Sequence, residues 1–207
     1  MAEIQTFQLG PLETNAYLIL NDGRAVVIDP GGEPEVLVEA LGNTVLEAIV
    51  NTHLHFDHIQ GNAGLQRATK APILASNDDA DLLESELGGG GLWGLPRTEP
   101  FAFEPLNAGT WNWAGLDCRV MHTPGHSSGS HSLYFPELKA VFCGDLLFYR
   151  SVGRTDFPGG SLNVLERSVR ENIFTLPEDT VIYPGHGPET SVGDEMRHNP
   201  FLSDFRP

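Results

Sequence analysis

Short apolar runs alternate with turn signals along the chain, a pattern typical of strands and helices in an α/β protein. Three such runs open the sequence, at residues 4–9, 15–20 and 25–29. We predict three strands from them, and an Asp-Gly pair at 22–23 predicts a tight hairpin turn between the second and the third. A helix is predicted over residues 35–41, where Gly42 ends it.

The rest of the chain continues this alternation of strands and helices. Strands are predicted over residues 46–53, 71–76, 130–137, 139–145 and 180–187, with a hairpin over 110–125. Helices are predicted over residues 58–69, 77–87 and 161–176. Residues 88–105 hold five glycines within seven positions and three prolines, so we expect a loop, either a surface connection or a flap facing a substrate. The pattern predicts a single α/β domain over residues 1–207, with helices covering a sheet.

Charge and composition narrow the class of partner. The net charge is −16, from 12 basic and 28 acidic residues, which argues against general binding of nucleic acid but leaves room for a local cationic pocket. The first residues form no basic leader with an apolar segment, and no run reaches the about 18 apolar residues of a membrane span. We therefore expect a cytoplasmic protein without a membrane partner, whose Cys118 and Cys143 are reduced core thiols.

Side chains of metal-ligand type follow five of the predicted strands. They are Asp29, the cluster His53, His55, Asp57 and His58, the pair His122 and His126, then Asp145 and His186. Most lie beside Gly or Pro, where the backbone turns sharply. Because ligands of open α/β sheets bind beyond the strand ends, we expect these loops to converge. His122, His131 and His198, each taken alone, are expected to be hydrogen-bonded structural residues.

The segment HLHFDH at residues 53–58 suits two cations better than one. In an extended segment His53 and His55 point to the same side, and a bend into a helix at Asp57 aims Asp57 and His58 at a neighbouring point. The missing ligands could come from His126, Asp145 and His186, and of these only the aspartate can bridge with two oxygens. Nitrogen and oxygen ligands suit zinc, iron or manganese, and the lack of cysteine ligands argues against a closed structural zinc site.

HLHFDH, followed by TPGHSSGS, FCGDLLF and YPGHG, resembles the metallo-β-lactamase superfamily over nearly the whole chain. The resemblance implies a four-layer αββα sandwich of two mixed sheets flanked by helices. It also implies that His53, His55 and His126 hold a first metal ion and that Asp57, His58 and His186 hold a second. Asp145 would bridge the two ions, and Asp29 would orient the ligands.

The segment LLFYRSVGRTDFPGGS is similar to the hydroxyacylglutathione hydrolase (glyoxalase II) branch, and the two ends of the chain resemble its short form. This implies hydrolysis of a small-molecule thioester such as S-lactoylglutathione. A hydroxide shared by two divalent ions, zinc in preference to iron or manganese, would attack the carbonyl, with Asp57 and Asp145 as catalytic residues. Arg154 falls where longer enzymes bind glutathione, and Arg150 and Tyr149 are further candidates for substrate binding.

Differences from the longer enzymes leave the identity of the substrate undecided. The chain ends at Pro207, before the helical region that completes their glutathione pocket, and Gly187-Pro188 and Asp156 stand where they carry tyrosines. The alternatives are a persulfide dioxygenase with one iron, a lactonase, a phosphodiesterase or RNA-processing nuclease, and a metal-binding scaffold without activity. We expect a monomer, or a homodimer formed through the loop at 88–105.

Overall fold

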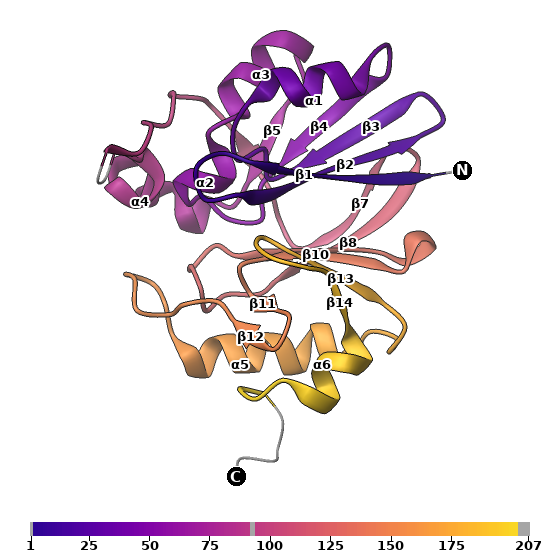
Figure 1. The fold of residues 1–207 in the computed structure, drawn as a ribbon, viewed down its shortest axis with the longest axis vertical. Coiled ribbons are helices and arrows are strands. Elements are labelled where there is room, and N and C mark those ends of the chain that lie inside the picture. Colours follow the sequence, from indigo (N-terminus) through magenta and orange to yellow (C-terminus); the bar gives the residue numbers. More distant parts are fainter. Residues whose placement is uncertain (1, 92–93, 203–207) are drawn as a thin grey trace.

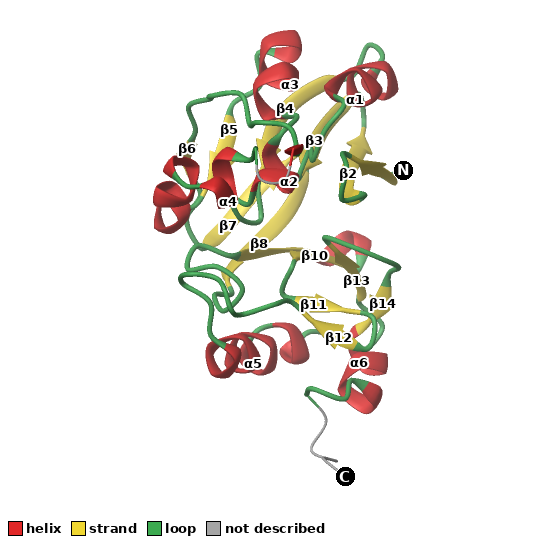
Figure 2. Ribbon diagram, turned by 60° about the vertical axis from the view of Figure 1, so that its left-hand side comes forward, coloured by secondary structure: helices red, strands yellow, loops and turns green. Residues whose placement is uncertain are grey.

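Two β-sheets pack face to face, and helices cover the outer surface of each (Figures 1 and 2). The computed structural model describes residues 2–91 and 94–202. The two mixed sheets flanked by helices confirm the predicted α/β sandwich. Within the described residues, no helix is both long and apolar enough to cross a membrane.

The first sheet comes from the N-terminal half and has the strand order β1-β2-β3-β4-β5-β6. Its strands are β1 (Glu3–Leu9), β2 (Thr14–Asn21), β3 (Arg24–Ile28), β4 (Val45–Val50), β5 (Ile73–Ala75) and β6 (Glu104–Pro105). The first three run antiparallel, and β3 to β6 run parallel. Asn21 pairs with Arg24, so the predicted two-residue turn joins β2 to β3.

The second sheet comes from the C-terminal half and has the order β14-β13-β10-β9-β8-β7. Its strands are β7 (Gly109–Trp113), β8 (Leu116–His122), β9 (His131–Phe135), β10 (Ala140–Gly144), β13 (Val181–Pro184) and β14 (Thr190–Ser191). All neighbours are antiparallel except β10 and β13, which are parallel. A separate hairpin consists of β11 (Leu147–Phe148) and β12 (Ser151–Val152).

The helices divide between the two halves of the chain. The N-terminal half contains α1 (Pro34–Leu41), α2 (Phe56–Ile59), α3 (Asn62–Thr69), the 3₁₀ helix η1 (Asn77–Glu84) and α4 (Glu86–Gly89). The C-terminal half contains η3 (Pro136–Leu138), α5 (Leu162–Glu171), η4 (Ile173–Thr175) and α6 (Val192–His198).

The strands are buried on both faces because they lie between two layers. In β2, Tyr17 and Ile19 belong to the core between the sheets, whereas Ala16 and Leu18 belong to the core beneath the helices. Strand β10 divides in the same way, since Phe142 faces the other sheet and its neighbours pack against the helical layer. This double burial explains why several strands read as continuous apolar runs.

The structure differs from the predicted elements at several places, and the last two residues of the expected loop form strand β6. The helix predicted over 58–69 is split into α2 and α3, because Gly61 lies against Pro30: its N–H donates to the Pro30 carbonyl at 2.7 Å. The helix predicted over 77–87 is a 3₁₀ helix followed by α4, so the expected loop begins inside α4. The hairpin β11–β12 and helix α6 were not predicted, and residues 92–93 of the loop lie outside the described part.

Candidate metal centre

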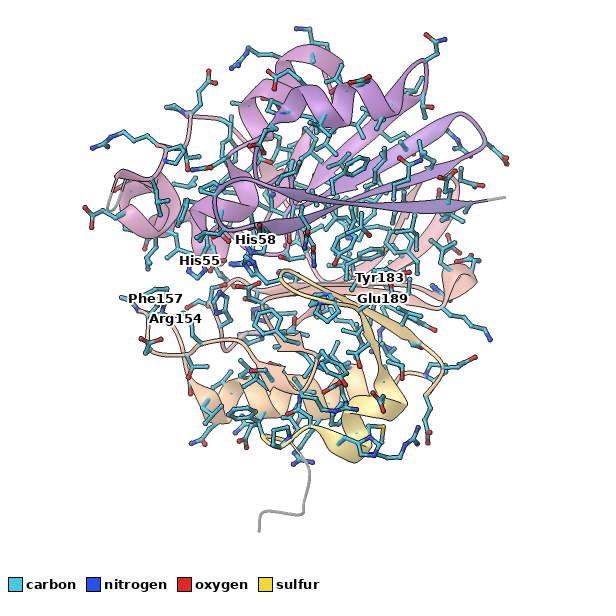
Figure 3. The ribbon with its side chains drawn as sticks, viewed as in Figure 1. His55, His58, Arg154, Phe157, Tyr183 and Glu189 are labelled. Carbon is cyan, nitrogen blue, oxygen red and sulfur yellow. The ribbon has the colours of Figure 1, made fainter. Side chains whose placement is uncertain are left out.

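The predicted ligand residues meet at one edge of the sandwich, between the two sheets. The cluster from 53 to 58 follows β4, His126 lies in the loop from β8 to β9, Asp145 follows β10 and His186 follows β13. Figure 3 shows His55 and His58 between the upper and lower halves of the molecule, with Phe157 and Arg154 nearby on the lower half. The structure therefore brings together loops that are far apart in the sequence.

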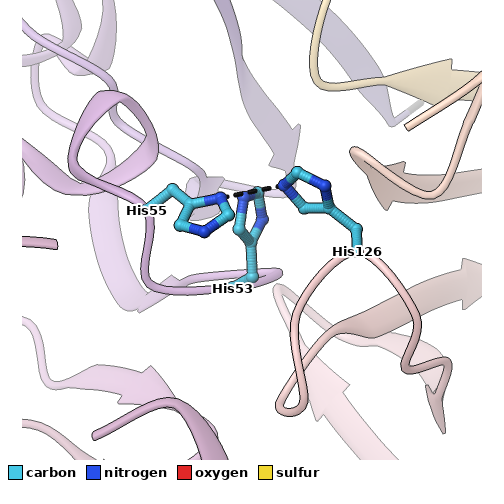
Figure 4. A group of neighbouring side chains, drawn as sticks. All are labelled: His53, His55 and His126. Carbon is cyan, nitrogen blue, oxygen red and sulfur yellow. Dashed lines mark hydrogen bonds between the residues drawn. The ribbon is translucent and has the colours of Figure 1, made fainter. Parts of the chain in front are cut away.

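His53, His55 and His126 form the first group, and their ring nitrogens lie close enough together to hold one metal ion. The three rings stand edge to face, with centroids 4.6–4.8 Å apart. Nδ1 of His55 lies 2.8 Å from Nε2 of His126, as the dashed line in Figure 4 marks. The alternation expected for an extended segment explains why His53 and His55 share one side.

Asp57, His58 and His186 form the second group. Oδ2 of Asp57 lies 3.1 Å from Nε2 of His186 and 3.5 Å from Nε2 of His58. Helix α2 starts at Phe56, so the bend expected at this point of the cluster is present and separates this pair from the two preceding histidines.

Asp145 lies between the two groups. Its Oδ1 is 3.3 Å from Nε2 of His58, and its Oδ2 is 3.7 Å from Nε2 of both His126 and His186. Gly185 leaves room for this carboxylate, because a Cβ at that position would lie 2.1 Å from Asp145 Oδ1. One carboxylate thus faces ligands of both groups.

Hydrogen bonds on the far side of the rings orient the ligands. Oδ2 of Asp29 lies 2.9 Å from His58 Nδ1 and accepts a bond from Thr52 Oγ1 at 2.6 Å, while Oδ1 accepts one from Thr52 N at 2.7 Å. Nδ1 of His126 lies 2.8 Å from the carbonyl oxygen of Arg154. In both rings the Nδ1 is engaged, so Nε2 is the atom left to face a cation.

Unsatisfied buried atoms test whether the donor set fits metal ions. Among the described residues, the buried side-chain atoms without a hydrogen-bond partner are His53 Nε2, His58 Nε2, Asp145 Oδ1 and Thr180 Oγ1. Buried polar atoms normally have partners; two of these four belong to the two groups, and a third belongs to Asp145 between them. A divalent cation at each group would satisfy them, so the residues fit two such ions.

Burial lowers the pKa of two histidines of the first group, His53 and His55. Burial lowers the pKa of His53 well below its usual value, and the neighbouring histidines lower it further. Burial, together with the nearby His126, lowers the pKa of His55 to about 3. Neutral imidazole is the form that binds a metal ion, so His53 and His55 are already in the form that binds.

The second group has the opposite electrostatics. Burial disfavours the charge on His58 and His186, but the adjacent carboxylates outweigh it and raise the pKa of both. Burial likewise opposes ionisation of Asp57 and Asp145, and the adjacent histidines overcome it and lower both pKa values. Without metal, imidazolium–carboxylate pairing balances the charge here, and a cation would replace those protons.

The three candidates for substrate binding lie in different surroundings. The Arg154 guanidinium is exposed, pairs with Asp156 through two bonds of 2.8 Å and covers the Phe157 ring. The Arg150 guanidinium instead contacts Asp194 and Glu195 of α6, and it also covers the ring of the exposed Tyr149. These contacts favour a structural role for Arg150, and the Tyr149 ring packs against the Arg150 guanidinium.

The histidines expected to be structural are hydrogen-bonded outside the two groups. His122 Nε2 and His131 Nδ1 lie 2.9 and 2.8 Å from the carbonyl oxygens of Ser128 and Gly129. His198 Nδ1 lies close to both the carbonyl and the carboxylate of Asp194.

Several residues at the centre carry no signal in the sequence. Thr14 Oγ1 donates to Asp57 Oδ2 at 2.9 Å, and Asn15 Nδ2 donates to the carbonyls of Pro184 and Gly187, on either side of His186. Phe157 packs its ring against His55, with 5.8 Å between the centroids. Thr14 precedes the apolar run at 15–20 and Asn15 begins it, so only the folded chain shows what they contact.

The αββα fold and its two His/Asp groups define a metal-binding protein whose centre lies between two sheets. The sequence profile of the metallo-beta-lactamase superfamily matches residues 9–186. The chain therefore belongs to the metallo-beta-lactamase superfamily.

Curated relatives align over almost their full length. The chain is 38% identical over 203 residues to the probable metallo-hydrolase YqgX of Bacillus subtilis, covering 95% of this chain and 96% of the relative. It is 33% identical over 207 residues to the hydroxyacylglutathione hydrolase GloC of Haemophilus influenzae, covering 97% and 98%.

Solved structures agree with the fold. The BLEG-1 B3 metallo-beta-lactamase superposes with a TM-score of 0.89 at 39% identity, covering 97% of this chain and 99% of the other. TTHA1623 in a di-iron-bound form gives 0.86 at 40% identity, with 96% and 100% covered. ETHE1 from Myxococcus xanthus gives 0.79 at 28% identity, with 97% and 84% covered.

Proposed function

We propose that this protein is a binuclear metal-dependent hydrolase of thioesters of the S-lactoylglutathione type. The observation that carries the proposal is the position of Asp145, whose two oxygens face ligands of both metal groups. The near full-length similarity to the hydrolase GloC supports the choice of a thioester. Zinc remains the predicted metal, and the di-iron-bound relative supports iron as the alternative.

When bound, two divalent ions supply an activated water nucleophile and polarise the substrate carbonyl. The protein residues hold that chemistry in place. Asp145 would provide negative charge between the two cation positions, Asp57 would hold the second cation, and Thr14 fixes Asp57 through its hydroxyl. A thiolate is a good leaving group, so hydrolysis of a thioester needs no dedicated general acid.

Arg154 is proposed to bind a carboxylate of the substrate. Its ion pair with Asp156 is exposed on both sides, and exposed pairs contribute little because water screens them. An incoming carboxylate can therefore compete for the guanidinium, which offers two parallel donors. Phe157, between this arginine and His55, would provide an apolar wall beside the first metal group.

The test is the rate of S-lactoylglutathione hydrolysis, measured beside a metal analysis of the same sample. His55→Ala and Asp145→Ala should abolish hydrolysis together with loss of bound metal, and full activity in either variant would contradict the proposal. Arg154→Ala should raise KM for an anionic thioester more than for a neutral one. Equal effects on both substrates would remove the proposed role of Arg154.

A persulfide dioxygenase is the second candidate, because the structure of ETHE1 superposes over most of both chains. A dioxygenase would contain one iron per chain and consume oxygen with glutathione persulfide, whereas the hydrolase would not consume oxygen. A β-lactam belongs in the same assay, since the BLEG-1 structure is described as a B3 metallo-beta-lactamase. Turnover of either compound without thioester hydrolysis would replace our proposal.

A further inference from the structure

Asp79 in η1 is a buried carboxylate that lies outside both metal groups. It is 1% exposed, and each of its oxygens accepts hydrogen bonds. Oδ1 accepts from Gly129 N at 2.6 Å, and Oδ2 accepts from Ser127 Oγ at 2.7 Å and from Leu54 N at 3.2 Å. Burying a charged group without such partners would be costly, so this arrangement is a built network of donors around one carboxylate.

The partners of Asp79 are neighbours of the first metal group. Leu54 lies between His53 and His55 in the chain, and Ser127 directly follows His126. His53 and His55 follow β4 of one sheet, and His126 follows β8 of the other. One carboxylate oxygen therefore connects the two loops that carry all three ligands.

We propose that Asp79 is a positioning residue for the first metal group and not for the second. The backbone bond from His131 N to Thr52 O also links these loops, but His131 lies in β9, further from His126 along the chain than Ser127, which directly follows that ligand. A metal ion requires its three imidazoles at a fixed separation, and the carboxylate holds the two loops at that separation. The proposal concerns metal binding and is independent of the substrate.

The second metal group is held by other residues, which makes the proposal selective. Thr14 and Asn15 of β2 fix Asp57 and the turn around His186, as described above. Their bonds do not involve Asp79, whose own hydrogen bonds go to Leu54, Ser127 and Gly129. Loss of the Asp79 carboxylate should therefore weaken one metal position and spare the other.

The decisive variant is Asp79→Asn, which keeps the shape but turns one acceptor oxygen into a donor. Either orientation of the amide points N–H₂ at the backbone N–H of Gly129 or of Leu54, so one of those bonds is lost. The substitution is made in two backgrounds: His186→Ala, which leaves the first group intact, and His53→Ala, which leaves the second. Co²⁺ affinity is measured in each by competition with a chromophoric chelator, and the visible spectrum of bound Co²⁺ reports its ligand geometry.

We expect Asp79→Asn to weaken Co²⁺ binding about 10-fold to 100-fold in the His186→Ala background, the usual effect of removing a group that orients metal ligands. Affinity in the His53→Ala background should stay within twofold. Ser127→Ala removes one donor and should give a smaller loss with the same selectivity, which keeps the test valid if the asparagine variant does not fold. Equal losses in both backgrounds, or none in either, would overturn the proposal.

Glu195→Gln is the matched control. Glu195 is equally buried, and its carboxylate accepts bonds from Arg150, Thr190 and Asn199. Those partners include no neighbour of the first group, so the variant should lower the thermal stability of the metal-free protein without a selective loss of Co²⁺ affinity. A selective loss at the first group in this control would show that general destabilisation, and not Asp79, explains the effect.

Discussion

Replacing Asp29 by asparagine should weaken the second metal position through the tautomer of His58. Asp29 is 1% exposed and accepts three hydrogen bonds, two from Thr52 and one from the His58 ring. Its backbone has a φ of +50°, a left-handed conformation that asparagine adopts more readily than alanine. Asn is therefore the substitution that changes the chemistry while keeping the backbone.

The size of the effect follows from those three bonds. If the amide keeps its oxygen towards Thr52 N, its N–H₂ group faces His58 Nδ1. Nδ1 must then accept a hydrogen bond, so the neutral His58 ring carries its proton on Nε2. Nε2 is the atom that faces Asp57 and Asp145, so metal binding must first reverse the tautomer. Removing such an orienting partner typically reduces metal affinity about 10-fold to 100-fold. That factor corresponds to about 1.4–2.7 kcal/mol.

The assay is the chelator competition with Co²⁺ in the His53→Ala background, where only the second group remains. Asp22→Asn serves as the control, because Asp22 also has a positive φ of 48° but is exposed in the turn after β2. Unchanged affinity in the Asp29 variant would refute the tautomer argument. An equal loss in the His186→Ala background would show that Asp29 supports the whole centre and not His58.

Three further predictions concern the pH dependence of metal binding, the room that Gly185 leaves for Asp145, and the hydrophobic core. Metal affinity at the second group should fall as pH decreases, because nearby carboxylates raise the pKa of His58 and His186 and the metal must displace their protons; proton release on Co²⁺ binding, measured calorimetrically in two buffers, checks this. Gly185→Ala should remove metal without unfolding the chain, because the new Cβ would lie 2.1 Å from Asp145 Oδ1, and metal content with circular dichroism tests it. Phe142→Ala should lower the free energy of unfolding by about 3–5 kcal/mol, because its fully buried ring packs between the sheets, and urea denaturation measures it.

Much of the fold follows from local patterns in the sequence. Apolar periodicity and turn signals predicted most of the strands and helix α1, since side-chain alternation and chain reversal depend on neighbouring residues. The split at Gly61 could not be predicted this way, because its cause is a contact with Pro30 in another loop. Helix α6 and the β11–β12 hairpin are short, and Arg150 ties them together through Glu195 rather than through any periodic pattern.

At the candidate metal centre, the sequence by itself predicted the ligand types and their division into two pairs. Those features depend on the alternation from His53 to His55 and on the bend that follows, both of which are local. Only the tertiary structure decided which other residues fix the ligand loops in place through hydrogen bonds. Asp79 and Ser127 are 48 positions apart, and Asn15 reaches Pro184 across 169. Contacts at such separations depend on how the two sheets pack, and no short stretch of sequence encodes that packing.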